Sequence, residues 1–142
     1  MHRCADRAAF AGVSRRSLLV SLAAAGLTAA PPAHSQALMR RFPRTALRGE
    51  IAFGAFPQIT VNGKPAQLAP GSRVRDAANM NAMPGALAGN KAIVNYTVDS
   101  SGLVHDVWIL RADEIAVQPW PRTPAEAGAW FFDDGAQRWS KP

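Results

Sequence analysis

The chain has 142 residues, of which 16 are basic, 10 are acidic and 48% are apolar, with 11 glycines, 11 prolines and one cysteine. This length allows one domain with an appendage but not two domains that each bury an adequate core. The charged fraction of 18% is too low for a charge-driven disordered chain. The longest apolar run is interrupted by Ser21, Gly26 and Thr28 and is followed by two prolines, so the sequence predicts no permanent membrane span.

Residues 1–37 have the three parts of an export signal peptide: a polar basic start, an apolar stretch and a cleavage region ending at Ser35-Gln36-Ala37. The run Ser-Arg-Arg-Ser-Leu-Leu stands before the apolar stretch, with Arg15 and Arg16 as its pair of arginines. This run resembles the twin-arginine export signal. An ordinary secretory signal is the alternative. Both interpretations predict a bacterial protein that is periplasmic or secreted.

Removal of this leader changes the composition of the chain. Cys4 is lost, so the mature chain from about Leu38 has no cysteine for disulfides, thiolate catalysis or metal sites. The leader holds four of the 16 basic residues and one of the 10 acidic ones, which leaves 12 against nine. Beyond residue 48 the balance is eight against nine, and this near-neutral body predicts no nucleic-acid partner.

Residues 38–48 form an Arg-rich segment that we expect to be an extended, flexible arm. Its four arginines are Arg40, Arg41, Arg44 and Arg48. Two interpretations are open: weak contact of these side chains with anionic lipid headgroups, or a solvated tether.

Residues 49–142 are predicted to form a single β domain. A first strand is expected over residues 49–56, and Asn62-Gly63 indicates a hairpin because both residues tolerate positive φ. Pro70-Gly71 predicts a second turn, followed by a strand over residues 72–76.

The clearest strand pattern spans residues 91–98 and 103–110, joined by a polar turn that ends at Gly102. Strict alternation in the second of these strands places Asp106 and Trp108 on one face and His105 on the other. Because apolar residues occur on both faces, we expect this strand to be central and Trp108 to be buried.

A C-terminal helix is predicted over about residues 124–132. Thr123 is the expected N-cap, with Pro124 at the first helical position and Glu126 completing a capping box. The predicted fold is a small, partly open barrel of five or six antiparallel strands, OB-like or SH3-like, with this helix packed on one end.

Catalytic patterns are sparse in the mature chain. His105 is its only histidine and is followed by Asp106. Neighbouring residues on a regular strand point to opposite faces, so these two side chains form a dyad only if the strand is bulged. No other pairing of nucleophile and base is evident, and the sequence assigns no catalytic residue.

The segment around residues 79–84 contains a Met-x-x-Met pattern formed by Met80 and Met83. Thioether ligands suit Cu(I), which makes this pair a candidate copper site in an exported protein. The alternative is that both side chains fill gaps in the core. No other cofactor is expected.

The four tryptophans all lie beyond residue 107. Trp120, between two prolines, and Trp139 near the C-terminus either fasten the C-terminal segment to the barrel or form a stacking platform for a ligand, with Arg122 nearby.

These patterns favour an exported, non-enzymatic β-domain protein that binds a protein, a peptide or an envelope component. The alternatives are a periplasmic copper-binding protein that uses Met80 and Met83, or a small enzyme that uses His105 and Asp106. The sequence assigns no oligomeric state.

Overall fold

Five strands close into a barrel, and a sixth short strand pairs with the end of one of them. The computed structural model describes residues 38–142, and the predicted leader with Arg15 and Arg16 lies outside this range. The strands are β1 (Leu47–Phe53), β2 (Gln58–Val61), β3 (Lys64–Arg75), β4 (Asn81–Ala82), β5 (Lys91–Val98), β6 (Val104–Ile109), β7 (Phe131–Asp133) and β8 (Arg138–Ser140).

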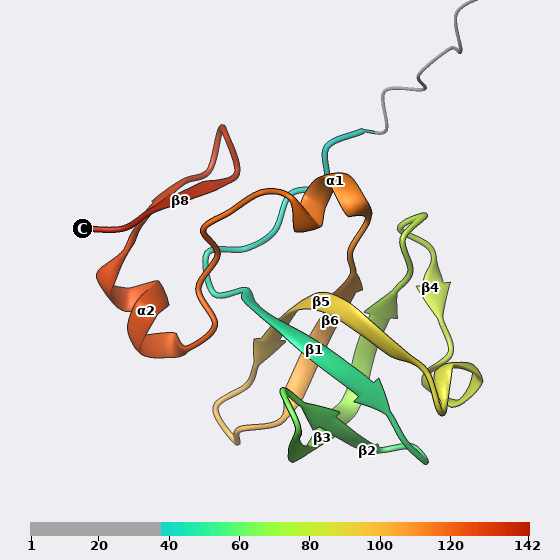
Figure 1. Ribbon diagram of the computed structural model, residues 1–142. Coiled ribbons are helices and arrows are strands. Elements are labelled where there is room, and N and C mark those ends of the chain that lie inside the picture. Colours follow the sequence, from blue (N-terminus) through green and yellow to red (C-terminus); the bar gives the residue numbers. More distant parts are fainter. Residues whose placement is uncertain (1–37) are drawn as a thin grey trace, which may run out of the picture. The chain divides into compact units, whose positions relative to one another are not determined.

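The barrel strands follow the order β2-β1-β5-β6-β3, and pairing of β2 with β3 closes the ring (Figure 1). The short β4 pairs only with β3. Strands β3 and β6 are parallel, whereas the other pairs are antiparallel. The prediction of a small, mainly β barrel is confirmed. The barrel is closed rather than partly open, and it is mixed rather than antiparallel.

The helices are short. They are η1 (Pro84–Leu87), α1 (Ala112–Ile115) and α2 (Pro124–Ala129). Within residues 38–142, no helix is long and apolar enough to cross a membrane.

Two predicted turns are confirmed. Asn62 and Gly63 have φ angles of 50° and 78° and join β2 to β3. In the turn between β5 and β6, Gly102 has a φ of 82° and the Asp99 carboxylate accepts hydrogen bonds from two backbone N–H groups. Both turns depend on residues that tolerate positive φ, which is why local sequence predicts them.

The predicted turn at Pro70-Gly71 does not separate two strands. Strand β3 continues through it, and its pairing with β6 shifts register between Leu68 and Arg73. Residues 64–67 of β3 pair with β2, Leu68 already pairs with β6, and after the shift β3 pairs with both β6 and β4. Pro70 lacks the N–H needed for a regular ladder, which explains why the pairing is interrupted in this stretch of the strand.

Strand β6 carries a bulge that changes which side chains face inward. Tyr96 lies opposite Val107 and Val98 lies opposite Val104, so β6 has one more residue than β5 between the same pairs. The extra residue places Val104 and Val107 together in the barrel core. Strict alternation, predicted from sequence, is therefore wrong for this strand.

The barrel interior forms the first hydrophobic core. Its most deeply buried aliphatic side chains come from four different strands: Ile51, Val74, Val94 and Val107. Burial of Tyr96 in the same core raises the pKa of its hydroxyl.

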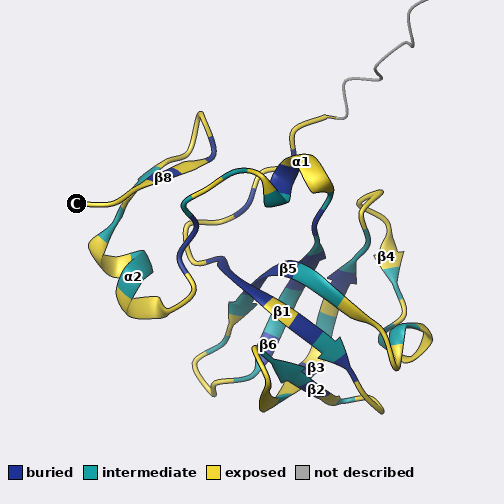
Figure 2. Cartoon of the chain, in the orientation of Figure 1, coloured by how far each residue is buried: buried dark blue, intermediate teal, exposed yellow. Residues whose placement is uncertain are grey.

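A second core lies outside the barrel and is mostly aromatic. Figure 2 shows buried stretches outside the barrel in the arm and the C-terminal segment. The buried members of this core come from the arm, from β6 and from the C-terminal segment: Phe42, Ala46, Trp108, Leu110, Trp120 and Trp139. Figure 1 shows the arm running between the barrel and the C-terminal elements α2 and β8. Burial of Trp108 agrees with the prediction, although it occurs in this second core and not in the barrel.

The arm differs from the flexible tether that the sequence predicts. Arg40 and Arg48 are both buried. The Arg48 guanidinium lies 4.7 Å from the centre of the Trp120 ring and donates hydrogen bonds to the Val117 carbonyl (2.6 Å) and to Asn95 Oδ1 (3.1 Å). Burial lowers the pKa of Arg48 to about 10, although the Glu114 charge opposes the shift. A buried guanidinium is tolerated only when its N–H donors have acceptors. The hydrogen bonds of Arg48 meet this need and fix the arm to the rest of the domain.

The C-terminal helix ends earlier than predicted. Helix α2 stops at Ala129, and Trp130 already has extended backbone angles. Phe131 and Phe132 belong to β7, which pairs with β8. The Phe132 ring lies 4.8 Å from the Trp139 ring, so cross-strand aromatic packing replaces the predicted last helical turn.

The predicted N-cap of α2 is confirmed and provides a test of local stability. Thr123 Oγ1 accepts a hydrogen bond from the Glu126 N–H (3.3 Å), and Glu126 Oε2 accepts one from the Thr123 N–H (3.3 Å). Thr123→Ala should lower the free energy of unfolding by only about 1 kcal/mol, because one cap of a short exposed helix is lost. Thermal denaturation measures this, and the more conservative Thr123→Ser should unfold like the parent.

Candidate functional site

A cleft rich in arginine opens where the parallel strands β3 and β6 end. Its volume is about 510 Å³, within the range of small-ligand sites. Because parallel strands end at the same edge of the sheet, Arg75 of β3 lies beside Trp108 of β6. We call this the arginine cleft, and its lining residues are Leu38, Met39, Arg40, Arg41, Arg75, Ala78, Asn79, Trp108 and Arg111.

Arg40 forms the buried wall of the arginine cleft. Its Nε donates to Glu114 Oε1 (2.8 Å), and its Nη2 also contacts the Glu114 carboxylate. The remaining donors reach the backbone carbonyls of Asp76 (2.8 Å) and Ile109 (2.7 Å). Since its charge is balanced and its donors are used, Arg40 holds the arm, the end of β3 and α1 together.

Arg111 stands at the start of α1 and is partly neutralised. Its guanidinium lies 3.2 Å from Asp113 and 3.3 Å from Glu114. The hydrogen bond from Arg111 lowers the pKa of the Asp113 carboxyl. The backbone N–H of Arg111 also donates to Glu114 Oε2 (2.9 Å), which fixes this residue at the cleft.

Arg75 is the least neutralised cation of the cleft. Its side chain is half-buried, and its guanidinium has no hydrogen-bond or ion-pair partner among residues 38–142. Arg41 pairs with Asp134 across 3.6 Å, but both side chains are exposed and such a contact is weak. The cleft is lined by four arginines and no acidic residue, and three of the four pair with acidic side chains just outside the lining, so Arg75 supplies its uncompensated positive charge within residues 38–142.

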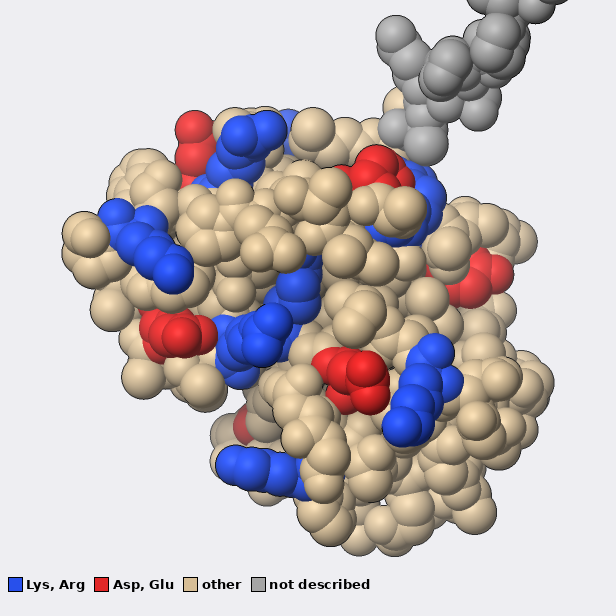
Figure 3. All heavy atoms as spheres, in the orientation of Figure 1, with Lys and Arg blue, Asp and Glu red and all other residues tan. Residues whose placement is uncertain are grey.

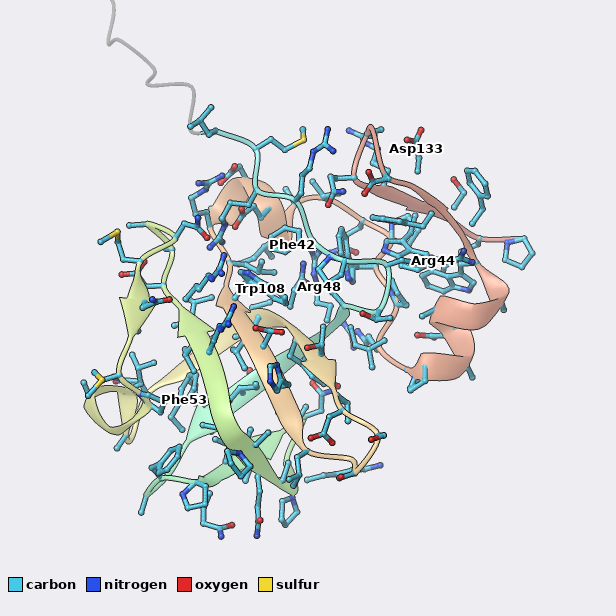
Figure 4. The ribbon with its side chains drawn as sticks, turned by 180° about the vertical axis from the view of Figure 1, so that it is seen from behind. Phe42, Arg44, Arg48, Phe53, Trp108 and Asp133 are labelled. Carbon is cyan, nitrogen blue, oxygen red and sulfur yellow. The ribbon has the colours of Figure 1, made fainter. Side chains whose placement is uncertain are left out.

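Trp108 contributes an aromatic ring to the lining of the cleft, although most of this side chain is buried. Its ring packs edge-to-face on Phe42 with a centroid distance of 5.8 Å. Figure 4 shows Phe42, Trp108 and Arg48 gathered between the barrel and the C-terminal hairpin. On the side of the molecule shown in Figure 3, basic and acidic patches are interspersed, and neither sign dominates.

The tryptophans considered as a ligand platform are buried instead. Trp120 and Trp139 are 6% and 2% exposed, with ring centroids 6.3 Å apart. The Trp120 Nε1–H donates to the Ala46 carbonyl (3.0 Å). Both rings therefore complete the second core and offer no open face for stacking. Arg122 is exposed, and its backbone N–H donates to Glu126.

Met80 and Met83 lie immediately before and after β4, and both side chains are exposed. They do not fill the core, which was the alternative interpretation of the pair. Across residues 38–142, no group of three or more His, Cys, Asp or Glu side chains is arranged to hold a metal ion. In the described part of the chain, Met80 and Met83 therefore have no such cluster of metal ligands beside them.

His105 and Asp106 are brought together by the bulge in β6. Nδ1 of His105 lies 3.0 Å from Oδ2 of Asp106, and both side chains are partly exposed. Thr97 Oγ1 accepts a hydrogen bond from the Asp106 N–H (3.2 Å) and holds the bulged backbone. The expectation that these neighbours point apart is wrong, because the bulge breaks the alternation.

Two further depressions are smaller and contain fewer charges. One, of about 440 Å³, lies between the arm, the end of β5 and α2 and includes Arg44. The other, of about 290 Å³, lies on β1, β2 and β3 and has no charged residue in its lining. Neither of these nor the arginine cleft is lined by His105 or Asp106.

Sequence reasoning identified the Arg-rich arm but missed the arginine cleft. Its other arginines, Arg75 and Arg111, lie far from the arm in sequence and meet it only in the fold. The available signal was the position of Arg75 near the end of the strand predicted over residues 72–76. No protein-family model, no curated protein and no solved structure matches this chain.

Proposed function

We propose that this protein is an exported, non-enzymatic binding module that takes an anionic ligand in the arginine cleft. The observation that carries the proposal is Arg75, a half-buried cation without an acidic partner in residues 38–142, in a cleft lined by arginines. Guanidinium groups bind phosphate and carboxylate through paired, charge-assisted hydrogen bonds. An anionic envelope component is the partner class that suits this site, and export rests on the leader pattern of residues 1–37.

The barrel architecture supports a binding role. We infer an OB-like barrel, because five strands run in the order β1-β2-β3-β6-β5, with η1 between the third and fourth barrel strands. OB barrels commonly bind ligands on the second and third strands and the adjoining loops. In this chain the depression on that surface is small and uncharged, so the arginine cleft is the better candidate.

A small enzyme is the second candidate, and the 3.0 Å contact between His105 and Asp106 is the observation that favours it. A carboxylate that accepts a hydrogen bond from Nδ1–H leaves Nε2 available as a base. The binding role has stronger support, because His105 lines none of the three depressions described above. Copper binding rests only on the exposed pair Met80 and Met83.

Phosphate binding tests the proposed function. Inorganic phosphate should raise the melting temperature of the parent chain, because a ligand that binds only the folded state stabilises it. Arg75→Gln should weaken phosphate binding at least about tenfold, the effect of losing one charge-assisted hydrogen bond. Titration calorimetry measures the affinity, and thermal denaturation without phosphate should be nearly unchanged.

Arg73→Gln is the matched control. Arg73 lies two residues earlier in β3 and is exposed, and it does not line the cleft. Phosphate affinity should therefore equal that of the parent. Equal loss in both variants would indicate a general charge effect, and unchanged binding in Arg75→Gln would remove the cleft as the ligand site.

A further inference from the structure

Exposed apolar side chains border the arginine cleft. Leu38 and Met39 line it and are 90% and 69% exposed. Met80 follows the lining residue Asn79 and is 66% exposed. We call Leu38, Met39 and Met80 the apolar rim. These three are among seven large apolar side chains that are exposed in residues 38–142, so the rim is a concentration of such side chains beside the most basic cleft.

A basic cleft beside exposed apolar side chains is complementary to the surface of an anionic bilayer. A soluble anion would satisfy the arginines, but it would leave the apolar rim in water. At the surface of an anionic bilayer the lipid phosphates can reach basic side chains while neighbouring apolar side chains enter the boundary with the acyl chains. Both features of the cleft are then used at once.

We propose that this side of the molecule docks on an anionic phospholipid bilayer, with a lipid phosphate in the arginine cleft and the apolar rim in the interfacial region. This inference rests on the proposed function and names its ligand. Arg75 supplies the free cation, and Arg111 and Arg41 lie beside it in the lining.

Co-sedimentation with lipid vesicles tests the proposal. Residues 38–142 form a compact unit with two cores of their own, and this form avoids the contribution of the leader to membrane binding. It should sediment with vesicles that contain phosphatidylglycerol and remain in solution with phosphatidylcholine alone. Arg75→Gln should lower the partition coefficient about fivefold, the effect of one basic side chain at an anionic surface. The same ranking of variants is expected for the full chain, where the leader is common to all.

The apolar rim provides the variant that separates lipid docking from simple anion binding. Met80→Ser should weaken vesicle binding severalfold and leave the affinity for inorganic phosphate unchanged, because Met80 belongs to the apolar rim but does not line the cleft. Phe131→Ser is the matched control, because Phe131 is 70% exposed in β7 and does not line the cleft. It should bind vesicles like the parent.

The outcomes distinguish the two proposals. Phosphate binding without vesicle binding would overturn docking on lipid and leave the proposed function standing. Vesicle binding that is equally reduced by Met80→Ser and Phe131→Ser would overturn the assigned surface. If neither phosphate nor vesicles bind, the proposed function fails together with this inference.

Discussion

Trp108→Ala is expected to lower the free energy of unfolding by about 3–5 kcal/mol. The indole is buried in the second core, where it contacts Phe42 edge-to-face. Its removal loses the transfer energy of a large apolar group and leaves a cavity between the arm and β6. The loss is large compared with the roughly 5–15 kcal/mol that stabilises a typical domain.

Urea and thermal denaturation measure this effect. Phe131→Ala is a suitable control, because that aromatic side chain is exposed in β7, and its loss should change stability by no more than about 0.5 kcal/mol. Phosphate affinity should also fall in Trp108→Ala, since the indole lines the arginine cleft. If the variant unfolds like the parent but loses phosphate binding, Trp108 serves recognition and its role in the second core is minor.

Local sequence was sufficient for features that depend on a few neighbouring residues. The Asn62-Gly63 turn requires positive φ at both positions, and the Thr123 cap requires only an acceptor and a glutamate three residues later. Strand β5 was likewise predicted with its observed bounds, because its apolar pattern is long and regular.

Features that depend on distant partners were missed. Closure of the barrel needs β2 to meet β3 while β3 also meets β6 in parallel, and no local pattern encodes that change of partner. The bulge in β6 moved Val107 into the core and placed His105 beside Asp106, because one extra residue inverts the alternation beyond it.

The candidate site shows the same division. Composition predicted a basic arm, but the roles of its arginines come from their partners in the fold. Arg40 forms an ion pair with Glu114, which lies 74 residues later in the sequence, and the guanidinium of Arg48 packs on the ring of Trp120. Arg75 has no such partner in residues 38–142, and its proposed role in binding rests on this contrast with the structural arginines.

Glu114→Ala should destabilise the fold about as strongly as loss of Trp108, by about 3–5 kcal/mol. The Glu114 carboxylate accepts hydrogen bonds from the Arg40 guanidinium and from the Arg111 N–H. Without it, the buried Arg40 keeps its charge and loses its counterion, which costs far more than the removal of an exposed pair. Chemical denaturation measures the change.

Asp113→Ala is the matched control, because Asp113 precedes Glu114 in α1 and is exposed. Its effect on stability should be small. The double variant Arg40→Met with Glu114→Ala tests the mechanism, since it removes both charges together. Its destabilisation should be clearly smaller than the sum of the two single effects, because the uncompensated charge is gone. Strict additivity would show that Arg40 and Glu114 stabilise the fold independently, and the buried ion pair would then not be what holds the arm against α1.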